Sequence, residues 1–167
     1  AVNRIFAEHV KKVVWGAETI VLVQDYHLAL LPQFLKEIDP GIRVAHFWHI
    51  PWPHWETFRV FPWAKELLTG LLASDLVDFH TPGYCRNFLE SAERFVEASV
   101  DYDRQEIMCG DRTTRVRAFP IGVDVEQITR DGQGEDVKKR MEELKITLDL
   151  EGKVVGVGLE REDYTKG

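Results

Sequence analysis

Three short stretches of the chain combine residue types that bind sugars or phosphates. The first is V-Q-D-Y-H-L, in which Asp25 follows the apolar run at residues 19–23. Ligands of open parallel sheets bind beyond the carboxyl ends of the strands, where a carboxylate can accept hydrogen bonds from two sugar hydroxyls. Asp is also a common N-cap of helices. Asp25 is therefore predicted either to bind a sugar or to cap the next helix.

The second stretch is H-F-W-H-I-P-W-P-H-W-E-T-F, residues 46–58, in which His49 follows a predicted strand. Four of the five tryptophans lie in or near it, namely Trp48, Trp52, Trp55 and Trp63. Aromatic walls with a few polar groups suit the C–H faces of sugar rings. The alternative is that most of these tryptophans pack the domain.

The third stretch is G-L-E-R-E-D-Y-T-K-G, residues 158–167, which follows an apolar run predicted to be a strand. Arg161 and Lys166 lie where the next helix is expected to begin. Two cations beside the free N–H groups of a helix start suit a diphosphate. The spacing is not that of a Walker A loop. Alternatively, Arg161 pairs with Glu162 or Asp163 on a solvated surface.

A metal site is also conceivable from the residue types, which are Asp25, His27, His46, His49 and His54. His46 and His49 do not share a helical face, and strand alternation directs them to opposite sides of a sheet. We therefore expect no metal site.

Composition excludes several classes of function. The net charge is −7 and no basic run is present, which argues against nucleic-acid binding. No apolar run reaches the roughly 20 residues of a membrane span, and no signal-peptide pattern opens the chain. Cys85 and Cys109 form no C-x-x-C pair, so reduced thiols and a cytoplasmic location are expected. The opening lacks Met and resembles the middle of a helix, so an internal piece of a longer protein is expected.

Hydrophobic periodicity predicts an α/β fold. Helices are expected over residues 2–15, 28–41, 64–75, 83–98 and 135–147, and buried strands over 19–23, 42–48, 76–80 and 153–158. Thr81 and Pro82 have the types of a helix cap and first turn. Alternating strands and helices imply right-handed βαβ units, a Rossmann-like parallel sheet and helices on both faces.

The rhythm breaks after residue 105. Two β-type runs flank Gly110-Asp111, which predicts a hairpin or an addition to the sheet edge. The polar stretch at 126–136 is expected to be a linker. It would join the carboxyl-terminal part of one Rossmann-like domain, residues 1–125, to the start of another, residues 137–167.

Taken together, five motifs resemble the trehalose-6-phosphate synthase family, which comprises retaining GT-B glycosyltransferases of family 20. They are V-Q-D-Y-H-L-A-L-L-P-Q-F-L, H-I-P-W-P-H-W-E-T-F-R-V-F-P-W, L-L-A-S-D-L-V-D-F-H-T-P-G-Y, R-V-R-A-F-P-I-G-V-D and E-R-E-D-Y-T-K-G. Their order and spacing agree with the family from Val2 to Gly167, which would be the middle of a full-length enzyme.

The resemblance implies roles for four residues. Asp25 would bind hydroxyls of the acceptor sugar, and His49 would lie against the donor glucose. Arg161 and Lys166 would hold the donor diphosphate and stabilise the charge on the leaving group, so no metal or other cofactor is expected. The implied partners are a nucleotide-glucose donor and a sugar-phosphate acceptor, without nucleic acid or membrane, and a homo-oligomer is left open.

Two departures from the family pattern leave alternatives open. Glu162 stands where the family usually has an apolar residue, and H-I-P-W-P replaces the commoner H-I-P-F-P. The leading function is transfer of glucose from UDP-glucose or a similar donor to glucose 6-phosphate. The alternatives are a synthase with another phosphorylated acceptor, of the glucosylglycerol-phosphate type, and a catalytically silent regulatory homologue.

Overall fold

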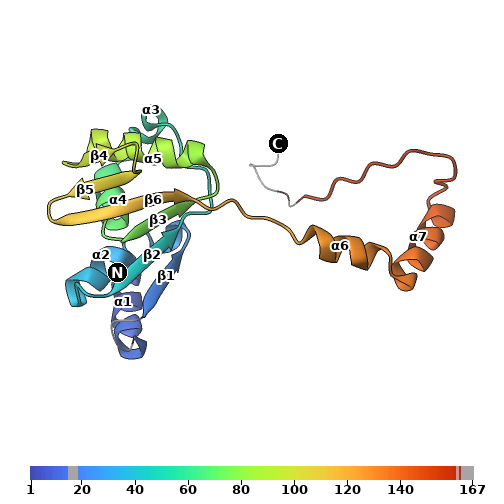
Figure 1. Cartoon of the computed structure of the whole chain (residues 1–167), viewed down its shortest axis with the longest axis horizontal. Coiled ribbons are helices and arrows are strands. Elements are labelled where there is room, and N and C mark those ends of the chain that lie inside the picture. The colour runs from blue at the N-terminus through green and yellow to red at the C-terminus, as the bar shows by residue number, and fades with distance from the viewer. Residues whose placement is uncertain (15–18, 161, 163–167) are drawn as a thin grey trace. The chain divides into compact units, whose positions relative to one another are not determined.

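The computed structural model describes residues 1–14, 19–160 and 162 (Figure 1). The chain forms two compact units, residues 1–121 and residues 122–167. Arg161 and Lys166 lie outside the described residues.

The first unit is built on a six-stranded sheet in the order β1-β2-β3-β6-β5-β4. The strands are β1 (Ile20–Gln24), β2 (Arg43–Phe47), β3 (Leu76–Phe79), β4 (Ser99–Asp101), β5 (Glu106–Cys109) and β6 (Arg112–Ala118). Strands β1, β2, β3 and β6 pair in parallel, which confirms the predicted parallel sheet. Strand β5 pairs antiparallel with β6 and β4. The predicted hairpin is therefore also confirmed, and Gly110 has the positive φ of 59° that a tight hairpin turn needs.

The helices of this unit are α1 (Val2–Val13), α2 (Leu31–Ile38), α3 (Trp55–Phe58), α4 (Ala64–Leu71) and α5 (Pro82–Phe95), with a 3₁₀ turn, η1 (Tyr26–Leu28). Helix α5 begins as predicted, because the Thr81 side chain accepts a hydrogen bond from the Tyr84 N–H. Gly70 lets α4 approach the start of α2, since a Cβ there would lie 2.6 Å from Leu30 Cδ2.

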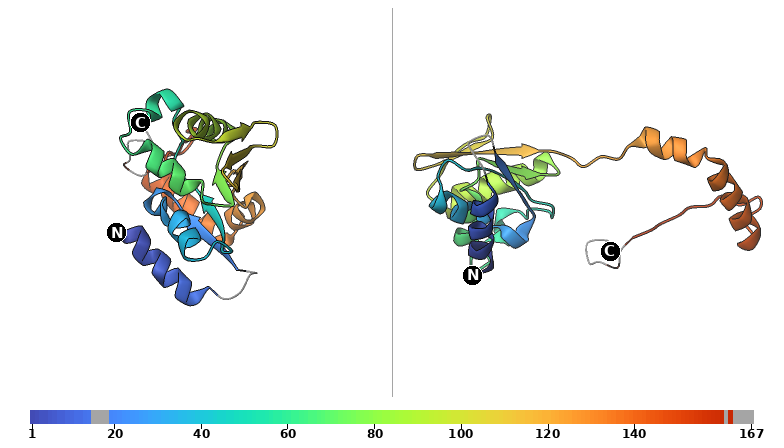
Figure 2. Two further views of the ribbon diagram at one scale, coloured as in Figure 1. Left: turned by 90° about the vertical axis from the view of Figure 1, so that its left-hand side faces the viewer. Right: turned by 90° about the horizontal axis from the view of Figure 1, so that it is seen from below.

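The prediction of helices on both sheet faces is wrong for the described residues of this unit. Helices α1, α2, α4 and α5 contact one another in sequence and form one layer (Figure 2). The strand order explains this arrangement. The crossovers from β1 to β2, from β2 to β3 and from β3 to β6 are right-handed and all step in the same direction across the sheet. Helices would reach the other face only if a later crossover stepped in the opposite direction. Strand β1 is consequently buried on one face only, with Ile20 and Leu22 exposed on the other.

The helix-covered face of the sheet carries two apolar clusters. One lies under β1 and β2, and its buried members are Ala7, Val23, Leu31, Leu35, Ile42 and Val44. The larger one lies under β3, β5 and β6 and includes Val77, Phe79, Phe88, Ile107 and Val116. The first cluster fixes β1 and β2, whose carboxyl ends lead to Asp25 and His49.

The second unit contains α6 (Val125–Gly132) and α7 (Glu135–Thr147). Helix α6 covers much of the stretch expected to be a linker. The predicted strand at 153–158 is wrong, because these residues are exposed and have no regular secondary structure. A parallel strand requires hydrogen-bonded neighbours, and the described part of this unit provides none. The division into two Rossmann-like domains, residues 1–125 and 137–167, stays a prediction.

No helix within the described ranges is both long and apolar enough to cross a membrane.

Candidate functional site

The carboxyl ends of three adjacent parallel strands bring polar side chains together. Asp25 follows β1, His49 follows β2 by two residues and His80 follows β3. The backbone N–H of His49 donates to Oδ1 of Asp25 over 3.3 Å. The ring centroids of His49 and His80 lie 5.4 Å apart. The structure therefore brings Asp25 and His49 to one edge of the sheet, while their roles in binding stay predictions.

Asp25 has a strained backbone. Its φ of 61° and ψ of 178° belong to a region that only glycine adopts readily. Such a conformation costs about 1–3 kcal/mol and persists only where the surroundings determine it. Three contacts to residues in or after β2 do so here: the Asp25 N–H donates to the Phe47 carbonyl, His46 binds the Asp25 carbonyl, and His49 binds the carboxylate.

The carboxylate of Asp25 does not act as a helix cap. Asp25 occupies the N-cap position of η1, but its side chain makes no capping hydrogen bond. Its Oδ1 instead accepts a 3.3 Å hydrogen bond from the backbone N–H of His49. The capping interpretation is therefore wrong, and this half-buried carboxylate retains capacity to accept hydrogen bonds from a ligand.

The His49 side chain is exposed but held in place. Its Nε2 lies 2.6 Å from Oε1 of Gln24, and its ring centroid lies 4.6 Å from that of Phe47. With the amide oxygen accepting, the imidazole carries its proton on Nε2 and presents Nδ1 as an acceptor. Gln24 thus sets which ring nitrogen of His49 carries the proton.

Gln24 and His80 also belong to this site, although neither was predicted from the sequence. His80 follows β3 just as Asp25 follows β1, so the rule that singled out Asp25 applies to it as well. Its Nδ1 is buried and has no hydrogen-bond partner in the described part of the chain. The contact from Gln24 to His49 joins residues 25 positions apart, and no local pattern announces it.

Asp78 is a further buried polar residue near this edge. It is 4% exposed and pairs in register with Phe47 on one side and Arg117 on the other. Burial raises the pKa of its carboxyl to about 6, with Arg117 acting in the opposite direction. Its Oδ1 has no hydrogen-bond partner among the described residues.

Two of the four tryptophans of this region, Trp48 and Trp52, pack in the core of the unit. Trp48 and Trp52 are 5% and 1% exposed, and Trp52 donates its Nε1–H to the Ser91 hydroxyl. Both also border an apolar cavity of about 420 Å³ that begins beside Tyr26. It is lined by Tyr26, Trp48, Ile50, Pro51, Trp52, Pro53, Thr57, Phe58, Phe61 and Leu67. Tyr26 directly follows Asp25 in the chain, so this cavity lies next to the Asp25 loop.

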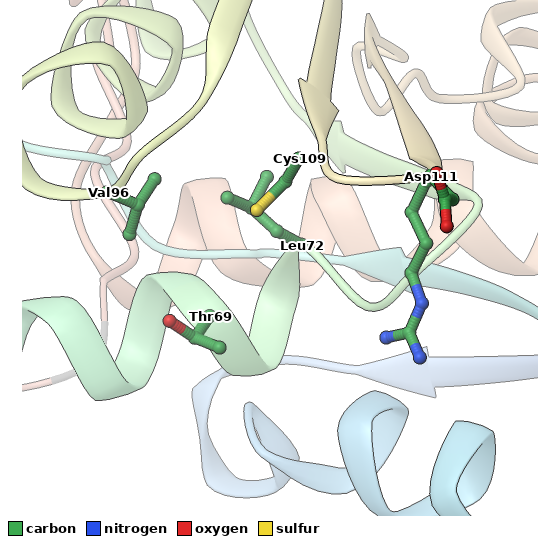
Figure 3. Close-up of a pocket in the computed structure, with 6 residues that line it drawn as sticks. Thr69, Leu72, Val96, Cys109 and Asp111 are labelled. Atoms are coloured by element: carbon green, nitrogen blue, oxygen red, sulfur yellow. The ribbon is translucent and has the colours of Figure 1, made fainter.

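A second cavity, of about 220 Å³, lies beside the β5–β6 turn (Figure 3). Its lining residues are Thr69, Leu72, Val96, Cys109, Asp111 and Arg112. Arg112 begins β6, so this cavity lies at the amino end of a parallel strand. None of the predicted site residues lines it.

Solved structures with a similar fold include trehalose-phosphate synthases and a domain of a protein named trehalose-6-phosphate phosphatase. An alpha,alpha-trehalose-phosphate synthase (UDP-forming) from Burkholderia xenovorans, in complex with glucose-6-phosphate, has a TM-score of 0.74 and 28% identity. That match covers 89% of this chain and 32% of the synthase chain. The N-terminal domain of Candida albicans trehalose-6-phosphate phosphatase has a TM-score of 0.78 and 29% identity, covering 86% and 31% of the two chains. The chain therefore has the Rossmann-like architecture of GT-B proteins.

The profile of glycosyltransferase family 20 matches residues 1–167, and the chain belongs to this family. Trehalose-6-phosphate synthase of Mycobacterium ulcerans is 38% identical over 173 residues, which cover 99% of this chain. That of Mycobacterium avium is 37% identical over 174 residues and covers all of it. The chain spans 34% and 35%, about a third, of the lengths of these two relatives.

Proposed function

We propose that this chain forms part of a retaining glycosyltransferase that moves glucose from UDP-glucose to glucose 6-phosphate and gives trehalose 6-phosphate. The observation that carries the proposal is the meeting of Asp25 and His49 at one edge of the parallel sheet. Relatives named trehalose-6-phosphate synthase, and a synthase solved with glucose-6-phosphate, support the choice of substrates.

In this proposal Asp25 binds the acceptor. Its carboxylate has only one hydrogen bond from the described residues, so further lone pairs are available to two sugar hydroxyls. His49 lies against the donor glucose, with Nδ1 as the acceptor that Gln24 leaves available. The half-buried Asp25 and the exposed His49 are both held in place by the scaffold, so they are suited to bind ligand without reorganising.

Arg161 and Lys166 are proposed to hold the donor diphosphate. Negative charge grows on the leaving oxygen as the glycosidic bond to the diphosphate breaks, and two fixed cations stabilise the transition state more than the ground state. One such interaction typically lowers the activation free energy by a few kcal/mol. We therefore propose transfer that does not depend on a metal ion, in the cytoplasm.

A catalytically silent homologue is the second candidate. It is favoured by the similarity to the N-terminal domain of a protein named trehalose-6-phosphate phosphatase. A synthase with a different phosphorylated acceptor is the third, because Asp25 recognises hydroxyls rather than one particular sugar.

Steady-state kinetics of the full-length protein, with UDP-glucose and glucose 6-phosphate, tests the proposal. Arg161→Ala and Lys166→Ala should each lower kcat about 10²–10³-fold, the usual loss of one preorganised charge stabiliser. Arg161→Lys should recover only part, since a point charge cannot replace the planar fork. The control is Arg140→Ala, which removes an exposed cation paired with Glu143 and should leave the rate unchanged.

A chelator should also leave the rate nearly unchanged. Activity that survives Lys166→Ala but disappears with chelator contradicts the proposed mechanism. A wild-type protein that binds both substrates without transfer favours the silent homologue.

A further inference from the structure

His46 is a buried polar side chain to which the proposed transfer assigns no role. It lies on β2 and is fully buried, on the helix-covered face that it shares with Val44. Its ring centroid lies 6.2 Å from that of Trp48. An imidazole in such a place costs free energy unless its polar atoms are paired.

Among the described residues, only one of the two ring nitrogens of His46 has a hydrogen-bond partner. Nε2 lies 3.1 Å from the carbonyl oxygen of Asp25. A carbonyl only accepts, so Nε2 carries the proton and donates it. Nδ1 is then an acceptor, and it has no hydrogen-bond partner among the described residues. Burial also lowers the pKa of His46 to about 4, so the ring is neutral near pH 7.

The paired nitrogen contacts the residue whose backbone is strained. The Asp25 N–H is bound to the Phe47 carbonyl at 2.7 Å, and the Asp25 carbonyl is bound by His46. These two contacts fix the peptide groups on either side of the Asp25 Cα. They therefore fix the direction of its Cα–Cβ bond, and with it the carboxylate that accepts from His49.

We propose that His46 is a positioning residue, which holds the strained backbone of Asp25 so that its carboxylate faces the acceptor sugar. The inference rests on the proposed function. His46 does not touch substrate. It acts through the Asp25 carbonyl, from the opposite face of the sheet to His49.

The test compares three variants of the full-length protein. His46→Phe keeps a ring but removes the N–H donor, and His46→Gln keeps a side-chain N–H at a reach similar to Nε2. Val44→Ala is the matched control, because Val44 lies on the same strand and face but does not contact Asp25. His46→Phe should raise the KM for glucose 6-phosphate about tenfold, the effect of losing about 1.4 kcal/mol, with the KM for UDP-glucose unchanged.

His46→Gln should restore the acceptor KM to within about threefold of the wild-type value, and Val44→Ala should lower the melting temperature without raising this KM. The inference is overturned if His46→Phe leaves the acceptor KM unchanged. An equal rise in this KM in His46→Phe and Val44→Ala would also overturn it, since general destabilisation would then explain both.

A readout without catalysis separates this inference from the proposed function. In the free protein, nitrogen NMR should show His46 as the Nε2–H tautomer, and hydrogen exchange should show a protected Asp25 amide. His46→Phe should accelerate exchange at Asp25 selectively, about tenfold, whereas Val44→Ala should accelerate it evenly along β1 and β2. An Nδ1–H tautomer, or unchanged Asp25 exchange in His46→Phe, overturns the positioning role even in an active enzyme. An inactive wild type with the expected exchange overturns the transfer reaction alone.

Discussion

Two aspartates at opposite ends of the same sheet have opposite surroundings. Asp75 immediately precedes β3, and its two carboxylate oxygens each lie 3.0 Å from Nζ of Lys36. Oδ2 of Asp75 also accepts the Val44 N–H at 2.7 Å. Asp25, after β1, has a positive φ, and within the described part of the chain its carboxylate accepts one long hydrogen bond. The amino end of the sheet uses its carboxylate to join α2 to the strands, whereas the carboxyl end keeps its carboxylate available at a cost in backbone strain.

The largest effect should come from Asp25→Asn. Asn preserves the size and branching of the side chain, so the backbone strain at this position changes little and the melting temperature should stay close to that of the wild type. The loss of charge weakens two hydrogen bonds to the acceptor, and kcat/KM for glucose 6-phosphate should fall about 10²-fold. Steady-state kinetics and a melting curve of the full-length protein measure both quantities.

Asp75→Asn is the control from the other end of the sheet. Lys36 is 9% exposed, and without its ionic partner the fold should lose about 1–3 kcal/mol. Activity per folded molecule should stay unchanged. If both variants lost stability and kept activity, the contrast between the two ends would be wrong.

The next effect concerns the dependence of stability on pH. Burial lowers the pKa of His46 to about 4 from 6.5, and the neighbouring His49 acts in the same direction, while the Asp25 carbonyl and charge oppose it. Between these values the unfolded chain binds more protons, so this stabilisation is complete above 6.5 and declines as the pH falls to about 4. His46→Phe cannot titrate. The free energy of unfolding of the wild type, relative to this variant, should therefore drop by about 2–3 kcal/mol from about pH 7 to about pH 4.5.

Urea unfolding of the two proteins at both pH values measures this difference. The raised pKa of Asp78 favours the fold at low pH, but it is common to both proteins and cancels in the comparison. A difference that does not change with pH would show that His46 protonates equally in the folded and unfolded states.

The smallest effect on stability is expected for Thr81, the N-cap of α5. It follows His80 at the carboxyl end of β3. Thr81→Ala removes the side-chain acceptor for the Tyr84 N–H and should cost about 1 kcal/mol, seen as a lower melting temperature. Thr81→Ser should restore it. The acceptor KM should not change in either variant, because this cap stabilises the helix and has no proposed contact with substrate. A tenfold rise in KM would extend the site to the start of α5.

Much of the sheet could be predicted, because buried parallel strands are short apolar runs with turn residues between them. The meeting of Asp25 and His49 followed from one rule, that the carboxyl ends of parallel strands share an edge. The strain at Asp25 and the contact from Gln24 to His49 could not be predicted. Both depend on atoms of β2 and the loop after it, which only the assembled sheet brings to these residues.

The two errors in the fold have one cause. Apolar composition shows that a segment can be buried, but it does not say what covers it. The runs at 19–23 and 153–158 are both rich in Val, yet β1 is covered on one face and the second run is exposed. Burial of a strand is decided by neighbours that its own sequence does not specify.

Strand β1 is also an edge of the sheet, since β2 is its one hydrogen-bonded neighbour within the described residues. Its exposed face presents Ile20 and Leu22, at 57% and 61% exposure. An edge strand with free N–H and C=O groups and apolar side chains is a template on which another extended chain can add. A protein of residues 1–167 alone is therefore expected to self-associate as its concentration rises. Leu22→Lys should reduce this association, because a charge on an edge strand opposes pairing.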